Sequence, residues 1–316
     1  MAISYFLNYA KPTHCLNIMF ICVSTVLYDH LPLTNACSNI TSNGINHIEI
    51  SMRHMQTAHT DRHEISNNIL NNDINVYSVH GPPIENCRII DPALKRHFKT
   101  AYKPYFEFAR ELCASVYVEH CGKAGYENWP FLKETVIENC KMLADYAECF
   151  SLTLAIENDM DGYGMLKTPE QFLTIIEKVK RNNLKITLDL KHAEHSGIKG
   201  ISPELFMDKL GDYIVNIHCA DLESPAPFVS DWEVPGTGKA KRLDAVLDNL
   251  KLKKYNGPIT LEINEMKIKA VIEKSILILG DDTDPEKFRR VLISSEFENM
   301  SLDYACKYLN KLINGK

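Results

Sequence analysis

The sequence predicts a (β/α)8 barrel, also called a TIM barrel, built from a single chain of 316 residues. Strand-like and helix-like segments alternate along the chain, which is the pattern of a parallel sheet with crossover helices. Eight such alternations follow one another without a linker rich in Pro, Gly or Ser. In addition, four of the strand-like segments end in a residue that can bind a metal, and parallel strands of a barrel all end at one mouth.

The expected elements follow in chain order. Strands are predicted at residues 17–25, 46–51, 74–80, 115–121, 152–157, 185–190, 213–219 and 258–263. Helices are predicted at residues 31–43, 60–71, 91–113, 130–150, 168–181, 202–211 and 241–253, with a last one within 284–314. Four helix starts show an N-cap residue followed by proline, namely Asp91-Pro92, Thr168-Pro169, Ser202-Pro203 and Asp284-Pro285.

The predicted domain organisation is one barrel with extensions at both ends. The barrel core is expected at about residues 17–264. Residues 1–15 are interpreted as an N-terminal extension, and residues 265–316 as a C-terminal helical extension. The apolar stretch Leu16 to Leu27 resembles the core of a signal peptide, but no small-residue cleavage site follows it convincingly, so a first strand is the favoured interpretation.

Composition narrows the function classes. The chain is 45% hydrophobic and 24% charged, and no apolar run is long enough to span a bilayer. A net charge of −6 without a basic block argues against a nucleic-acid partner. Ten cysteines occur without a CxxC pair or a disulfide-like spacing, which predicts buried reduced thiols in a cytoplasmic protein.

The four strand-end residues are Glu157, Asp189, His218 and Glu262. Side chains alternate along a strand, so Glu157 shares its face with the small or polar residues Thr153 and Ala155 rather than with the leucines. The other three strands repeat this pattern. A charge that caps one strand at the surface is the ordinary explanation for a single case, but four in one phase predict a shared site for a divalent cation.

Neighbouring strands add further candidates for the same mouth. Glu49 lies on the inward phase of the second strand, His80 and His120 end the third and fourth, and His192 follows the sixth. A single histidine at a strand end is more often a hydrogen-bonded structural residue. Together, however, these side chains form a ring where barrel active sites are built.

These segments resemble the xylose isomerase-like barrels. The resemblance rests on the strings HIEIS, VYSVHGP, AIEND, LDLKHAEHSG, IHCAD, PGTG and GPITLEI, which occur in this order within residues 17–264. This superfamily includes sugar and sugar-phosphate isomerases and epimerases, inosose dehydratase and endonuclease IV. The strings are specific for the superfamily but discriminate poorly between its members.

The resemblance implies an isomerase or epimerase that acts on a sugar, a sugar phosphate or a polyol through an enediolate. One divalent ion (Mn, Mg, Co or Zn) would be held by Glu157, Asp189, His218 and Glu262, with Glu157 and Glu262 as the acid/base pair. The expected substrate-binding residues are Glu49, His80, His120, His192 and Lys239. For Lys239 and Arg242 a solvated helix start is the simpler interpretation. The resemblance also implies a homodimer or homotetramer.

Three alternatives stay open. An endonuclease IV-like zinc phosphodiesterase acting on abasic DNA would use three zincs, but Glu233 stands where that family has a histidine two residues after Asp231. An inosose dehydratase-like lyase and a non-catalytic metabolite-binding barrel are the others. The arginine that ketose epimerases place soon after the seventh-strand histidine is missing before the PGTG turn.

Overall fold

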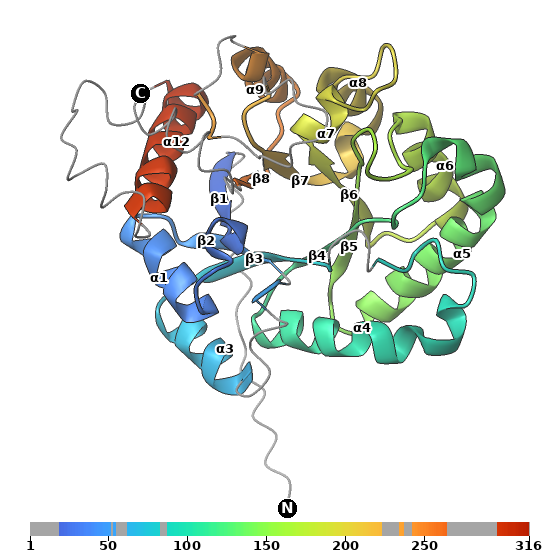
Figure 1. The fold of residues 1–316 in the computed structure, drawn as a ribbon, viewed down its shortest axis with the longest axis horizontal. Helices are drawn as coiled ribbons and strands as arrows, with labels where there is room; N and C mark the ends of the chain where they lie inside the picture. Colours follow the sequence, from blue (N-terminus) through green and yellow to red (C-terminus); the bar gives the residue numbers. More distant parts are fainter. Residues whose placement is uncertain are drawn as a thin grey trace, which may run out of the picture.

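A computed structural model describes residues 19–51, 53–54, 62–82, 87–222, 234–236, 242–263 and 296–315. Eight strands are present: β1 (Phe20–Ser24), β2 (His47–Ile50), β3 (Asn75–His80), β4 (Val116–Glu119), β5 (Thr153–Glu157), β6 (Leu184–Asp189), β7 (Ile214–Cys219) and β8 (Pro258–Leu261). All neighbouring strands pair in parallel, and β8 pairs with β1 to close the barrel. The predicted (β/α)8 fold is thus confirmed (Figure 1).

The helices form an outer layer around the strands (Figure 1). They are α1 (Leu33–Ser42), α3 (Arg62–Asn71), α4 (Leu94–Glu111), α5 (Trp129–Glu148), α6 (Pro169–Val179), α7 (Leu190–Glu194), α8 (Pro203–Leu210), α9 (Arg242–Leu252) and α12 (Glu296–Asn314). Short 3-10 turns are η1 (Thr25–Tyr28), η3 (Tyr126–Asn128) and η4 (Gly211–Tyr213). The C-terminal α12 contacts β1, α1 and α9, so it completes the outer layer next to the barrel closure.

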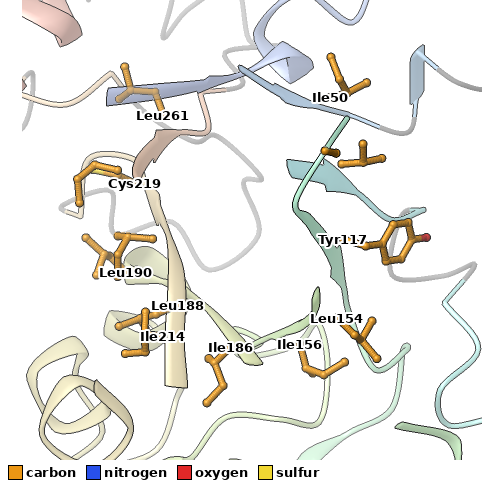
Figure 2. Packing of buried hydrophobic residues seen from close by; sticks show 14 of the residues in the cluster. Ile50, Tyr117, Leu154, Ile156, Ile186, Leu188, Leu190, Ile214, Cys219 and Leu261 are labelled. Atoms are coloured by element: carbon orange, nitrogen blue, oxygen red, sulfur yellow. The ribbon is translucent and has the colours of Figure 1, made fainter. Parts of the chain in front are cut away.

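Apolar residues between strands and helices make the main core. The labelled side chains in Figure 2 lie outside the ring of strands, as the predicted alternation requires. On β5, Leu154 and Ile156 belong to this outer core, whereas Ala155 belongs to a small apolar cluster with Val116 and Val118 inside the barrel. Glu157 continues the inward phase above Ala155, which places it at the mouth.

Two strands carry a bulge that the alternation did not predict. The β2–β3 register skips Tyr77, and the β6–β7 register skips Val215. The Tyr77 hydroxyl donates a 2.6 Å hydrogen bond to the Val215 carbonyl, although β3 and β7 lie on opposite sides of the barrel. The bulges shift the phase of both strands just below His80 and His218.

The capping interactions differ among the predicted helix starts that contain a proline. Thr168 and Gln171 form a capping box at α6, and the Ser202 hydroxyl accepts a hydrogen bond from the Leu205 amide at α8. The helix predicted to begin at Asp91-Pro92 begins about one turn later in the structure. The Asp91 carboxylate accepts from the Ala93 amide in a preceding turn, and α4 begins only at Leu94.

Several sequence predictions lie outside the described residues. They concern the extension at 1–15, residues 264–295 with Asp284-Pro285, and the side chains of Asp231, Glu233 and Lys239. Among the described residues, no cysteine forms a disulfide, and no helix has the length and hydrophobicity needed to cross a membrane.

Candidate active site

Glu157 is the centre of the site at the barrel mouth. Its carboxylate ends β5 and is buried, and histidines surround both of its oxygens. Oε2 lies 3.1 Å from Nε2 of His80 and 3.6 Å from Nε2 of His120. Oε1 lies 3.4 Å from Nδ1 of His192 and 3.4 Å from Nδ1 of His218. The structure therefore brings together residues from β3, β5, β7 and α7 with His120, which directly follows β4.

The imidazole of His218 is fixed from below. Its Nε2 lies 3.1 Å from Oε2 of Glu49, and its Nδ1 faces Oε2 of Glu262 at 2.9 Å. The same Glu49 oxygen accepts hydrogen bonds from Ser78 Oγ at 2.7 Å and from Asn216 Nδ2 at 3.1 Å. The structure places Glu49 fully buried beneath His218, a position suited to orienting the ring rather than to the substrate contact expected from the sequence.

Asp189 and His192 form a compact unit where β6 turns directly into α7. Asp189 is the N-cap of α7, and its Oδ1 accepts a 2.7 Å hydrogen bond from the His192 amide. The His192 ring lies with Nδ1 at 2.9 Å from the Asn158 carbonyl and at 3.7 Å from Oδ2 of Asp189. A helix that starts without an intervening loop thus returns His192 to the mouth.

His120 is held by a carboxylate that the sequence analysis did not select. Nδ1 of His120 lies 3.0 Å from Oδ1 of Asp159, while Oδ2 of Asp159 accepts a 3.0 Å hydrogen bond from the Leu166 amide. This arrangement directs Nε2 of His120 toward Glu157. Asp159 therefore orients one of the expected substrate-binding histidines.

The candidate metal ligands form two groups that share Glu157. His80, Glu157, His218 and Glu262 make one group, and Glu157, Asp189 and His192 make the other. Within each group, one ligand atom from every residue lies within 4.8 Å of all the others. The predicted set therefore does not form one group by itself, because Asp189 is grouped with His192 and His80 joins the other three.

Comparison with known proteins identifies the family. The model of the xylose isomerase-like TIM barrel family matches residues 37–282. The chain belongs to this family.

One relative of this xylose isomerase-like barrel matches over part of the chain. An uncharacterised protein of Methanocaldococcus jannaschii is 30% identical over 179 residues, which cover 54% of this chain and 58% of the relative. The chain thus matches somewhat more than half of the length of that protein.

Two solved structures show the same architecture. A D-tagatose 3-epimerase-like protein is 22% identical, with a TM-score of 0.64 and coverage of 85% of this chain and 100% of that chain. D-psicose 3-epimerase, solved in the presence of D-fructose, is 15% identical, with a TM-score of 0.70 and coverage of 94% and 100%. At these identities the likeness concerns the fold.

The donor atoms of this xylose isomerase-like barrel fit a divalent cation. Oε1 of Glu157, Nδ1 of His218 and Oε2 of Glu262 are buried and face one another, and none has a hydrogen-bond partner among the described residues. Buried polar atoms are almost always partnered, so this cluster needs an explanation. Carboxylate and imidazole donors together suit Mn²⁺, Co²⁺ or Zn²⁺.

The pKa values of residues at the barrel mouth also favour a bound cation. Burial would raise the pKa of Glu157, but His120 and His218 outweigh it and hold the pKa well below its ordinary value. Burial would lower the pKa of His80, but its hydrogen bond to Glu157 and the nearby carboxylates raise it to about 9. The buried carboxylates thus demand compensating positive charge, which imidazolium groups or a bound cation can supply.

Arg242 has a structural role in this barrel. Its guanidinium forms ion pairs with Glu194, at 2.8 Å from Nη2 to Oε2, and with Glu204. It therefore joins the start of α9 to α7 and α8. The alternative contact with a substrate phosphate or carboxylate is not favoured, because both partners already occupy the fork of this side chain.

Proposed function

We propose that the protein is a divalent-metal-dependent isomerase or epimerase of a sugar or related polyol. The observation that carries this proposal is the convergence of Glu157 Oε1, His218 Nδ1 and Glu262 Oε2 at the barrel mouth, where these buried atoms face one another and none makes a hydrogen bond to a described residue. Two carboxylates that face the same imidazole nitrogen can bind a cation and also exchange a proton with a substrate.

Glu157, His218 and Glu262 would hold the ion, with His80 or Asp189 as a further ligand. When bound, the ion supplies the positive charge that polarises a substrate carbonyl and acidifies the neighbouring C–H bond. Glu49 keeps the His218 ring in place by accepting a hydrogen bond on its far side.

The acid/base roles fall to Glu262 and Glu157. The side chain of Glu262 is 12% exposed, whereas that of Glu157 is 1% exposed. Glu262 is thus open to a substrate in the mouth and can take a proton from carbon. Glu157 comes from β5, faces the same Nδ1 of His218 at 3.4 Å, and would return the proton, giving epimerisation through an enediolate. His80 and His120, each 12% exposed, line the open side and are placed to bind substrate hydroxyls.

The comparisons support this class through the fold alone. The D-tagatose 3-epimerase-like and D-psicose 3-epimerase structures share the whole barrel with this chain. Because the arginine that ketose epimerases place after the seventh-strand histidine is missing, the sequence does not identify the sugar. The assay therefore needs a panel of ketoses and inososes.

The test measures bound metal and incorporation of solvent deuterium into each sugar of the panel. We expect Glu262→Gln to reduce exchange by about 10²- to 10⁴-fold, because an amide cannot accept the proton. Glu157→Gln should reduce both exchange and metal content. Glu170→Gln, which affects a surface ion pair with Lys209 on the helix layer, is the matched control and should leave exchange unchanged. A protein that binds no divalent ion, or variants that retain full exchange, would refute the proposal.

A zinc phosphodiesterase acting on abasic DNA is the second candidate. It is favoured by the histidines around Glu157, since His80 and His120 both approach Oε2 and zinc prefers nitrogen-rich ligation. Three zincs per chain and incision of an abasic duplex would support it. Loss of water from an inosose in the same panel would instead indicate a lyase.

A further inference from the structure

Asn158 follows Glu157 directly and is fully buried next to the site. Its side-chain amide makes two hydrogen bonds with the main chain of one residue on the neighbouring strand. Oδ1 accepts from the Asp189 amide at 2.8 Å, and Nδ2 donates to the Asp189 carbonyl at 3.0 Å. The side chain therefore extends the β5–β6 pairing beyond its last register pair, Glu157 with Thr187.

This pairing is needed because of the way β6 ends. The chain passes from β6 into α7 at Asp189 without a loop, and Asp189 keeps an extended backbone. Its N–H and C=O are buried and have no further strand residue of β5 opposite them. Buried backbone groups require partners, and a carboxamide offers one donor and one acceptor in a single planar fork.

The same residue also fixes His192. The main-chain carbonyl of Asn158 lies 2.9 Å from Nδ1 of His192, and Nδ1 in turn lies 3.4 Å from Oε1 of Glu157. The Asp189 carboxylate caps the helix that carries His192. Asn158 thus contacts both Asp189 and His192, which form the second candidate ligand group together with Glu157.

We propose that Asn158 is a positioning residue, which sets the geometry of Asp189 and His192 against Glu157 and thereby the affinity of the site for a divalent cation. This inference rests on the proposed function, because it assumes that Glu157 and Asp189 take part in metal binding. A merely structural asparagine would stabilise the barrel without affecting the metal.

The experiment compares Asn158→Ala with Asn139→Ala. Asn139 is a matched control on α5, since its buried amide also makes two side-chain-to-backbone hydrogen bonds, to the carbonyls of Ile89 at 2.8 Å and Asp91 at 2.9 Å. Both variants should lower the melting temperature of the chelator-treated protein. We measure the dissociation constant of Mn²⁺ by calorimetry with the metal alone, and then kcat and KM on any substrate found.

We expect Asn158→Ala to weaken Mn²⁺ binding by about 10- to 100-fold, as loss of outer-shell partners does elsewhere, and Asn139→Ala to leave it unchanged. Asn158→Ser, a smaller perturbation, serves if the alanine variant does not fold, and the same loss of affinity is expected. Equal dissociation constants for wild type, the Asn158 variant and Asn139→Ala would overturn the inference while the proposed function stands. Wild-type protein that binds no Mn²⁺, Co²⁺ or Zn²⁺ would instead overturn the proposed function.

Discussion

Glu119 carries a buried carboxyl on the outward face of β4, one residue before His120. Oε1 accepts a 3.2 Å hydrogen bond from the Tyr102 hydroxyl, and burial raises the pKa of the carboxyl to about 7. A Cβ at Gly81 would clash with Oε2 of Glu119 and lie 2.8 Å from the Val118 carbonyl. Glycine at position 81 therefore lets the chain pass close to this carboxyl immediately after His80.

The raised pKa of Glu119 predicts a pH dependence of stability. The folded pKa is about 7 against an ordinary value of 4.5, so folding loses stability as the pH rises from 4.5 through 7. At about 1.4 kcal/mol per pKa unit, the loss is about 3 kcal/mol. Glu119→Gln stays neutral and keeps an acceptor for Tyr102, so its free energy of unfolding should lack this decline.

Urea unfolding of both proteins in chelator, at several pH values from 4 to 8, checks this prediction. The difference between the two proteins isolates Glu119 from the histidines, which titrate in both. A difference that does not change with pH would contradict it.

At the scale of elements, α12 anchors the turn that follows β7. The Gly236 amide donates a 3.0 Å hydrogen bond to Oδ2 of Asp221, and the Tyr304 hydroxyl donates to the Gly236 carbonyl at 3.3 Å. Gly236 has φ +87°, and a Cβ there would lie 2.7 Å from the ring of Tyr308. The glycine is thus required both by its left-handed backbone and by the contact with α12.

We expect Gly236→Ala to lower the free energy of unfolding by more than Gly200→Ala does. Gly200 has φ +86° but nothing within 4 Å of an added Cβ, so it reports the backbone strain alone, which is about 1 kcal/mol or more. Urea denaturation of the two variants gives the excess due to Tyr308. Equal losses in the free energy of unfolding would mean that Tyr308 on α12 moves aside without a measurable energetic cost.

Elements with a local signal could be predicted from the sequence, and residues that act across strands could not. Alternation on β5 placed Glu157 correctly, and the Thr168-Pro169 sequence located α6, because both signals lie within a few residues. Asn158 and Asp159 acquire their roles from partners 31 and 39 positions away. The depth of Glu49 below the mouth was also hidden, because it depends on the register around the barrel.

At the scale of the whole molecule, the proposed metal would join strands from different sides of the barrel. Glu157 ends β5 and His80 ends β3, while His218 is the penultimate residue of β7 and Glu262 directly follows β8. A ligand that binds only the folded state stabilises it by mass action. Metal binding at the site should therefore stabilise the folded state of the entire barrel.

Addition of Mn²⁺ to chelator-treated protein should raise the melting temperature. At a free concentration of 100 times the dissociation constant the gain is about 2.7 kcal/mol, which corresponds to a rise of roughly 5 °C for a chain of this size. Differential scanning calorimetry measures the shift, and Glu157→Gln should abolish most of it. An unchanged melting temperature in wild type would argue against metal binding at the mouth.

The hydrogen bond between Tyr77 and Val215 has a kinetic consequence. It crosses the barrel from β3 to β7, and both residues pack on the inner cluster of Val116, Val118 and Ala155. Among the described residues, the interior of the barrel below the site is therefore filled by side chains. Under the proposed function, substrate and product would both use the mouth at which the site lies. Accumulated product should then inhibit turnover competitively, because it can leave the site only into the space from which substrate binds.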